Sequence, residues 1–141
     1  MKAAFVDTSA IYALLVAEHS DHQRSRAILT YIEATDIQLI SSSFVLQETL
    51  ALLQARIGIT AVRLFQEKVF PVLDVEWITN SIYERALAAL LAASKRHVSL
   101  TDWTSFEVMR ARGIRTAFAF DDHFEDQGFQ LLRTRGGQPL E

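Results

Sequence analysis

The chain contains no cysteine among its 141 residues, which excludes disulfides, thiolate zinc sites and a cysteine nucleophile. No apolar run approaches the ~18–20 residues needed to cross a membrane, and the N-terminus lacks the apolar stretch of a signal peptide. Neither glycine-rich phosphate-binding pattern, G-x-G-x-x-G or G-x-x-x-x-G-K-S/T, is present. These absences predict a soluble, cytoplasmic protein that has no membrane partner, uses no nucleotide cofactor and is not an ATPase.

The chain also lacks an excess of positive charge. It has 14 basic and 17 acidic residues, for a net charge of -3, whereas a basic domain is the usual footprint of bulk nucleic-acid binding. If several of the acids bind a metal ion, a substrate meets a less negative surface than this sum implies. The net charge therefore neither supports nor excludes RNA as a partner.

Hydrophobic residues make up 50% of the chain, and short apolar runs alternate with longer helical patterns. This alternation predicts an α/β fold, with a mainly parallel sheet between two helical layers. The expected strands are 3–6, 37–40, 72–75, 116–120 and 129–132, and the expected helices are 9–18, 20–34, 43–57, 60–71, 79–94 and 100–112. We expect one domain over residues 1–132 and a mobile tail over residues 133–141.

Four carboxylates lie where a solvated surface acid is not expected. Asp7 and Asp121 each follow an apolar run that is read as a strand, and ligands of open parallel sheets bind at the carboxyl ends of the strands. Glu48 interrupts a helix that is apolar on two sides, and Asp102 shares a helix face with inward-pointing residues. Because all four lead to one sheet edge, the sequence predicts an acidic pocket.

Each of these acids also has a purely structural interpretation. Asp7 can cap the following helix, and Asp102 lies in a first helical turn, where the helix dipole favours any acid. Glu48 can form a salt bridge or take up a proton, although a buried unpaired carboxylate is costly. Asp121 can be a turn residue, and its neighbour Asp122 cannot be distinguished from it by position.

Three or four carboxylates without cysteine fit the ligand preferences of Mg²⁺ and Mn²⁺ better than those of zinc. A divalent ion in such a pocket promotes phosphodiester hydrolysis by activating water and by stabilising charge on the phosphate and the leaving oxygen. Without the ion, the same acids repel a phosphate backbone. The predicted cofactor is therefore Mg²⁺, with Mn²⁺ as the other possibility.

With these residues assembled, the chain resembles the PIN-domain nucleases and, within them, the VapC-type toxins of type II toxin–antitoxin systems. The resemblance covers nearly the full length. Its motifs are Phe5-Val6-Asp7-Thr8-Ser9-Ala10, Glu48-Thr49-Leu50, Ser99-Leu100-Thr101-Asp102, Phe120-Asp121-Asp122-His123-Phe124 and Gly128-Phe129. Each motif is short, but their order and spacing together are specific.

The resemblance implies a PIN-like α/β/α sandwich and metal-dependent cleavage of RNA within the chain. It makes Asp7, Glu48, Asp102 and Asp121 the expected catalytic and metal-binding acids, with Thr8 or Ser9 supplying a hydroxyl nearby. It further implies a homodimer and a cognate antitoxin that covers the pocket. A catalytically silent PIN-like module that binds RNA or protein is the alternative. A phosphatase of the haloacid dehalogenase type is disfavoured, because it expects an acid where this chain has Ser9.

His123 and Arg110 are candidates for RNA contact. His123 follows the acidic pair, and Arg110 belongs to a group of arginines beside the last strands, where basic residues could receive phosphates. For both, a solvated polar side chain remains the competing interpretation. The sequence does not specify which RNA is cut.

Overall fold

The computed structural model describes residues 2–135 and 138–140, and a five-stranded sheet of order β3-β2-β1-β4-β5 lies at its centre. All four strand pairings are parallel. The strands are β1 (Ala3–Val6), β2 (Gln38–Ser42), β3 (Leu73–Glu76), β4 (Thr116–Phe118) and β5 (Gln130–Leu131). The expected α/β class is confirmed, and the five expected strands lie within one or two residues of their predicted bounds.

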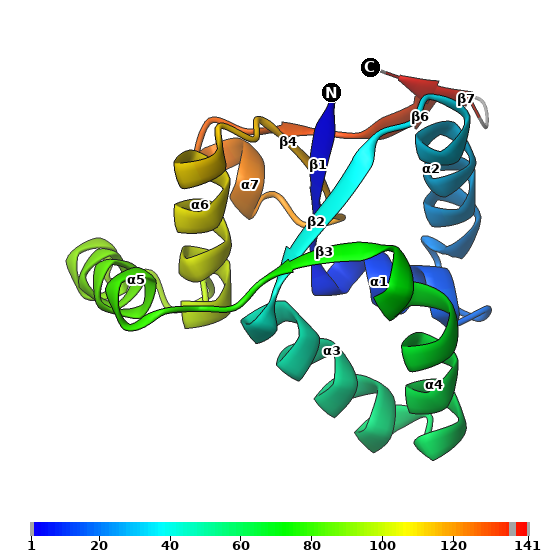
Figure 1. The fold of residues 1–141 in the computed structure, drawn as a ribbon, viewed down its shortest axis with the longest axis horizontal. Helices are drawn as coiled ribbons and strands as arrows, with labels where there is room; N and C mark the ends of the chain where they lie inside the picture. The colour runs from blue at the N-terminus through cyan, green and yellow to red at the C-terminus, as the bar shows by residue number, and fades with distance from the viewer. Residues whose placement is uncertain (1, 136–137, 141) are drawn as a thin grey trace.

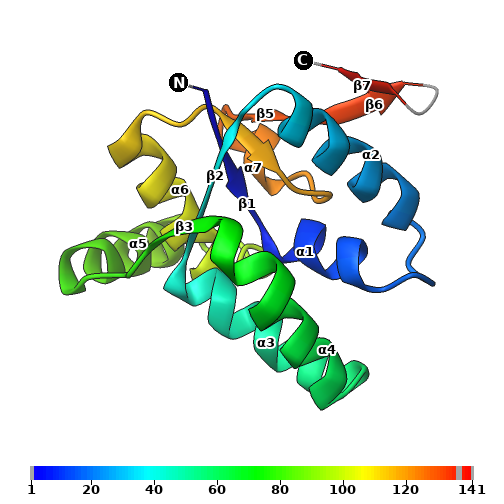
Figure 2. The same cartoon turned by 45° about the vertical axis from the view of Figure 1, so that its right-hand side comes forward.

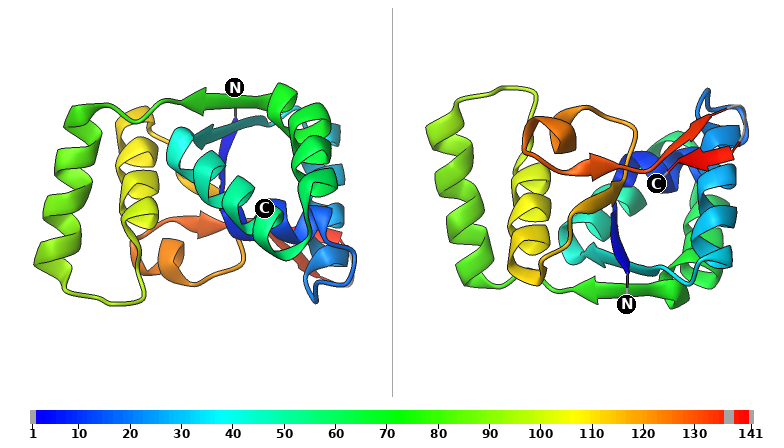
Figure 3. Two further views of the ribbon diagram at one scale, coloured as in Figure 1. Left: turned by 90° about the horizontal axis from the view of Figure 1, so that it is seen from below. Right: turned by 90° about the horizontal axis from the view of Figure 1, so that it is seen from above.

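The helices cover the sheet from two sides. They are α1 (Thr8–Leu15), α2 (His22–Ala34), α3 (Ser43–Arg56), α4 (Ile59–Leu64), the π-helix η1 (Phe65–Val69), the 3-10 helix η2 (Phe70–Val72), α5 (Asn80–Ala93), α6 (Leu100–Arg112) and α7 (His123–Asp126). Figure 1 shows α1, α2 and α4 on one side of the strands and α5, α6 and α7 on the other, and both views of Figure 3 agree. Within the described residues, no helix combines the length and apolarity needed to span a bilayer.

The order of the strands reverses beside β1. From β1 the chain moves outward through β2 to β3 and then returns to the other side of β1 as β4. Phe5 consequently pairs with Ile40 on one side and Ala117 on the other. Such a reversal leaves a crevice at the carboxyl ends of the two strands that separate there, which is where open α/β sheets bind ligands.

Aromatic side chains hold α6 and α7 against the sheet. The Phe106 ring meets the rings of Trp103 and Phe124 edge to face, at centroid distances of 5.3 and 5.2 Å. Phe124 also approaches Phe5 of β1, with the centroids 6.4 Å apart. Because edge-to-face pairs contribute about 0.5–1.5 kcal/mol beyond area burial, these contacts fix the segment after Asp121 and the first two turns of α6.

The last described residues form a small antiparallel ribbon. Strands β6 (Arg133–Arg135) and β7 (Gln138–Leu140) pair with each other and lie beside α2, as Figure 2 shows. The segment 133–141, expected to be a mobile tail, thus contains two short paired strands. Gly136, Gly137 and Glu141 lie outside the described residues, and the mobility of the segment and the domain limit at residue 132 stay predictions.

Candidate metal centre

Asp7 ends β1 and caps α1. Its backbone N–H donates to the Phe118 carbonyl at 3.0 Å, which joins the ends of β1 and β4. Its Oδ2 accepts hydrogen bonds from the Ser9 backbone N–H at 3.2 Å and the Ser9 hydroxyl at 2.7 Å. Oδ1 is buried and has no hydrogen-bond partner. The capping role foreseen for Asp7 is thus real, but it uses only one of the two oxygens.

Asp121 follows β4 at the same sheet edge. Its Oδ1 accepts the backbone N–H of His123 at 3.1 Å, and the side chain is half-buried. Asp122 is exposed. Asp121 is consequently the one of the two neighbours that lies with Asp7.

Asp102 reaches the same place from α6. Its Oδ2 accepts the Ser99 backbone N–H at 2.9 Å, and its own N–H donates to the Ser99 hydroxyl at 3.1 Å, which completes a capping box. Ser99 belongs to one of the sequence motifs, but no role at the site was expected for it. Its signal was the pattern Ser99-x-x-Asp102, which is a capping-box signature.

Asp7, Asp102 and Asp121 form one group, hereafter the acid cluster. One carboxylate oxygen of each lies within 4.8 Å of the others. Each acid uses one oxygen for a local backbone cap and keeps a second oxygen without a hydrogen bond among the described residues. The local caps therefore orient three carboxylates from β1, β4 and α6 without consuming their capacity to bind.

The electrostatics of the acid cluster are unfavourable for three negative charges. Burial, and then the charge of Asp121, raise the pKa of Asp7 to about 7. Burial also raises the pKa of Asp102. The hydrogen bond from the Ser99 N–H and the charge of His123 act in the opposite direction and lower it, but burial is the largest cause. No lysine or arginine among the described residues forms an ion pair with any of the three acids.

These properties fit a divalent cation. A cation would give the orphaned Asp7 Oδ1 a partner and would offset the repulsion that raises the pKa of Asp7. The donors are all carboxylate oxygens, which is the set that Mg²⁺ and Mn²⁺ prefer. Asp7, Asp102 and Asp121 are the residues that would hold it.

Glu48 does not join the acid cluster, which is a departure from the expected four ligands. Helix α3 has one buried side rather than two: Val45, Leu46, Thr49 and Leu53 are buried, while Ile57, expected on a second buried stripe, is 53% exposed. Glu48 itself is half-buried. Contrary to expectation, helix α3 is therefore not buried on both sides, because Ile57 at its C-terminal end faces solvent.

Glu48 nevertheless precedes Thr49 in the chain, and Thr49 contacts Thr8, the residue after Asp7. The Thr49 hydroxyl donates to the Thr8 hydroxyl at 3.1 Å, and the Thr8 hydroxyl donates to the Val45 carbonyl at 3.5 Å. Thr8 thus binds α3 and not the acid cluster, whereas Ser9 binds Asp7 directly. Of the two expected hydroxyls, the structure places Ser9 at the acids.

Of the two candidate RNA contacts, only His123 lies at the acid cluster. His123 lies at the acid cluster, because its backbone binds Asp121 and its charge acts on Asp102. Arg110 lies eight residues beyond Asp102, which is about 12 Å along α6. Its guanidinium stacks over Phe129 at 5.3 Å and donates to the Gln127 side chain at 3.1 Å. Arg110 is therefore not part of this site.

Comparison with known proteins identifies the family. The sequence profile of the PIN domain matches residues 4–130, which is nearly the whole chain. The chain belongs to the PIN domain family. The five parallel strands and the acid cluster are the parts of this PIN domain that the sequence motifs had indicated.

The relatives include a well-matched toxin. The chain is 35% identical over 130 residues to the 23S rRNA-specific endonuclease VapC20 of Mycobacterium tuberculosis, covering 92% of this chain and 97% of that protein. The crystal structure of that protein, described as a sarcin-ricin loop cleaving toxin, superposes with a TM-score of 0.80 at 36% identity over 92% of this chain and 98% of the other.

Two more distant structures share the fold. VapBC2 from Rickettsia felis, bound to a DNA fragment from its promoter, has a TM-score of 0.66 at 12% identity, covering 92% of this chain and 96% of that chain. FitAcB from Neisseria gonorrhoeae has a TM-score of 0.64 at 11% identity, covering 91% and 95%. At such identities the likeness concerns the fold alone.

Proposed function

We propose that this PIN domain is a metal-dependent endoribonuclease and the toxin of a toxin–antitoxin pair. The observation that carries the proposal is the acid cluster itself: three carboxylates from three elements meet at the switch point of the sheet, and the buried Oδ1 of Asp7 has no partner. The similarity to the VapC20 endonuclease over 92% of the chain supports this assignment.

The reaction is the addition of water across a phosphodiester P–O bond, which leaves one phosphomonoester and one free hydroxyl. A divalent cation, which we propose to be Mg²⁺ or Mn²⁺, supplies Lewis acidity that activates water and offsets phosphate charge. Ser9 orients the Asp7 carboxylate, Ser99 orients Asp102 and the His123 N–H orients Asp121. These caps hold the acids in place before any ligand arrives, so little reorganisation is needed on binding.

We assign Glu48 an outer role in the same site. It is half-buried beside the Thr49–Thr8 contact rather than within the acid cluster. From there its carboxylate can accept hydrogen bonds from water between it and the acids. In this role Glu48 supports the arrangement of the site and does not bind the cation directly.

The substrate we propose is 23S rRNA at the sarcin–ricin loop, as the name and title of the VapC20 relative describe for that protein. The test is cleavage of a synthetic hairpin of that loop by the purified protein with Mg²⁺ or Mn²⁺. We expect one major cut, its loss with EDTA, and its loss in Asp7→Asn. Wild-type-level cleavage by Asp7→Asn would overturn the assigned site, and no cleavage of this or other RNAs would favour the silent module.

We also propose a homodimer and a cognate antitoxin as partners. Trp77 and Leu91 are 65% and 68% exposed, at the start and near the end of the segment that carries α5. Large exposed apolar side chains are typical of interaction surfaces. Light scattering of the purified protein should give twice the chain mass, and Trp77→Ser with Leu91→Ser should give the mass of one chain.

A further inference from the structure

A small cavity of about 210 Å³ lies beside the acid cluster. Three segments that are distant in the sequence enclose it: α2, the loop between β4 and α7, and the chain that enters β6. Its lining includes Arg24 and Ile28 from α2, Phe120 and Asp122 from the loop, and Leu132 and Arg133 before and at the start of β6. We call it the Arg24 pocket.

The Arg24 pocket shares a wall with the acid cluster. Phe120 and Asp122, which line the pocket, flank Asp121 in the sequence. The Phe120 backbone N–H donates to the Ser9 hydroxyl at 3.0 Å, and that hydroxyl donates to Asp7 Oδ2 at 2.7 Å. The pocket therefore lies one loop away from the three acids that the proposed reaction uses.

Arg24 and Arg133 line the pocket, and the ion pair that each forms contributes little to stability. Arg24, whose side chain is 57% exposed, pairs with Asp21, which is 19% exposed. Arg133 pairs with Glu125 at 2.5 Å, with exposures of 54% and 41%. Ion pairs in which the arginine is exposed contribute only about 0–1 kcal/mol. Both guanidinium groups can therefore exchange a carboxylate for a phosphate at little cost.

Arg24 is also held in position. Its guanidinium lies over the Phe120 ring, 5.1 Å from the centroid. A cation–π contact of this kind contributes about 0.5–1 kcal/mol at an exposed site, and it reduces the entropy lost when the planar fork binds an anion. Arg112, by contrast, binds Asp74 and Glu76 together, so its charge is already compensated.

We propose that the Arg24 pocket binds an RNA backbone phosphate that neighbours the scissile one, with Arg24 and Arg133 as its ligands. The proposal rests on the proposed ribonuclease function. It answers a problem that the acid cluster poses: a chain of net charge -3 must attract a polyanion to three carboxylates. Arg24 and Arg133 bring two guanidinium groups to the edge of the site, each held there by a single acid, and bidentate arginine–phosphate contacts would also fix the register of the strand.

The test compares Arg24→Gln with Arg26→Gln on the sarcin–ricin hairpin. Both residues are exposed on α2 and both changes remove one charge, but two positions correspond to about 200° around a helix, and Arg26 does not line the pocket. We expect Arg24→Gln to raise KM about tenfold with kcat nearly unchanged, which corresponds to about 1.4 kcal/mol. Arg26→Gln should leave both constants close to wild type.

The salt dependence provides a second readout. Loss of one phosphate contact should reduce the slope of log affinity against log salt concentration by about 0.7 for single-stranded RNA. Arg133→Gln tests the pocket independently of α2 and should act in the same direction. Arg24→Lys, which keeps the charge without the fork, should recover part of the loss.

The outcomes separate this inference from the proposed function. If the wild-type protein does not cleave the hairpin, the proposed function fails. If the wild type cleaves it, but Arg24→Gln and Arg133→Gln match Arg26→Gln in KM and salt slope, the pocket is not a phosphate site. A loss confined to kcat would equally overturn the inference, because it would mean that the arginines act on the acid cluster and not on binding.

Discussion

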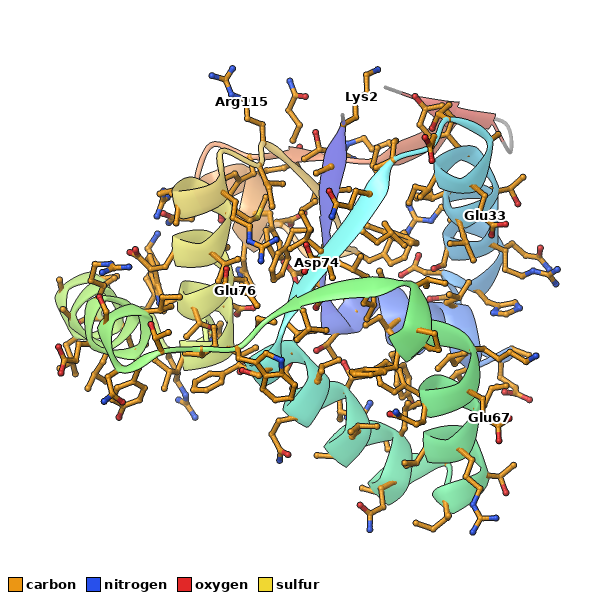
Figure 4. All side chains as sticks on the ribbon, in the orientation of Figure 1. Lys2, Glu33, Glu67, Asp74, Glu76 and Arg115 are labelled. Atoms are coloured by element: carbon orange, nitrogen blue, oxygen red, sulfur yellow. The ribbon has the colours of Figure 1, made fainter. Side chains whose placement is uncertain are left out.

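The carboxyl edge of the central sheet and its outer strand β3 both carry acidic side chains. The acids on β3 form ion pairs, whereas those of the acid cluster do not among the described residues. At the carboxyl edge, one carboxylate oxygen of each acid of the cluster lies within 4.8 Å of the others, and no described lysine or arginine forms an ion pair with them. On the outer strand β3, Asp74 and Glu76 each bind Arg112, at the end of α6, at 3.0 Å. Figure 4 shows Asp74 and Glu76 along β3, and Lys2 and Arg115 extending from the amino edge.

Charges that are paired and charges that lack a partner have different consequences for the protein. Paired charges near the surface compensate each other and contribute modestly to stability. Buried like charges that lack a partner cost stability in the free protein and are retained where a ligand compensates them. We therefore propose the carboxyl edge as the site, although a larger cavity of about 470 Å³ lies at the amino edge.

The largest expected effect is on activity at the carboxyl edge. Asp102→Asn keeps the shape of the side chain but removes a charge of the acid cluster. Loss of an outer-shell partner of a metal typically costs 10–100-fold, so loss of a ligand should reduce kcat/KM more than about 1,000-fold. Single-turnover cleavage of the sarcin–ricin hairpin measures it. Arg112→Gln should cleave at the wild-type rate. Comparable losses in the two variants would contradict the distinction between the acid cluster, which acts in catalysis, and the ion-paired charges on β3, which do not.

The second prediction concerns stability against pH without metal. The pKa of Asp7 is raised by burial from its ordinary value of 3.8 to about 7 in the folded protein, so the folded state binds the proton more tightly than the unfolded state. Stability should therefore fall as pH rises from about 4 to 7. Asp7→Asn should be more stable than wild type at pH 8, on the order of 2–4 kcal/mol.

Chemical denaturation in EDTA at pH 8 and near pH 4 measures this difference. The advantage of Asp7→Asn should shrink toward pH 4, where the wild-type carboxyl is protonated in the folded state and close to half protonated in the unfolded state. Addition of Mn²⁺ at pH 8 should stabilise the wild type and leave the variant unchanged. An advantage that is independent of pH would show that removal of the charge is not its cause.

The third prediction concerns residues that support the acid cluster. Ser9→Ala removes the hydroxyl that joins Asp7 to the Phe120 N–H, and Glu48→Gln removes the outer acid. Each should lower kcat/KM about 10–100-fold, less than Asp102→Asn. Ser20→Ala and Glu67→Gln, both at exposed positions, are the matched controls. A loss in Glu48→Gln as large as in Asp102→Asn would instead make Glu48 a direct ligand.

The smallest effect is expected from Arg112→Gln on stability. The arginine joins the end of α6 to β3 through two exposed or half-exposed acids. Its removal should destabilise the protein by about 1 kcal/mol, and high salt should shrink the difference, because salt screens exposed charges. Urea denaturation at low and high ionic strength tests this, and a loss that salt does not reduce would point to packing instead.

The sequence allowed the acid cluster to be predicted as far as strand ends and helix starts could be read. Asp7 and Asp121 follow apolar runs, and Asp102 follows a cap signal, so their common edge followed from the parallel topology. The choice between Asp121 and Asp122 required the structure, because adjacent residues after a strand have no periodic signal. The apolar pattern of α3 misplaced Glu48, since apolar residues can also face solvent, as Ile57 does.

The Arg24 pocket could not be predicted from the sequence. Arg24, Phe120 and Arg133 meet only because α2, the loop after β4 and the start of β6 pack together. Arg24 and Arg133 lie in no local pattern that differs from an ordinary solvated position, and Phe120 was expected only as the end of a strand. Such a site becomes visible only with the tertiary fold.

The most direct measurement of the central claim is calorimetric titration of Mn²⁺ into the metal-free wild-type protein and into Asp7→Asn and Arg112→Gln. We predict saturable binding to the wild type and to Arg112→Gln at pH 8, weaker binding below pH 7 as Asp7 takes up a proton, and loss of binding in Asp7→Asn. Wild-type affinity in Asp7→Asn would contradict the assignment of the acid cluster as the metal centre.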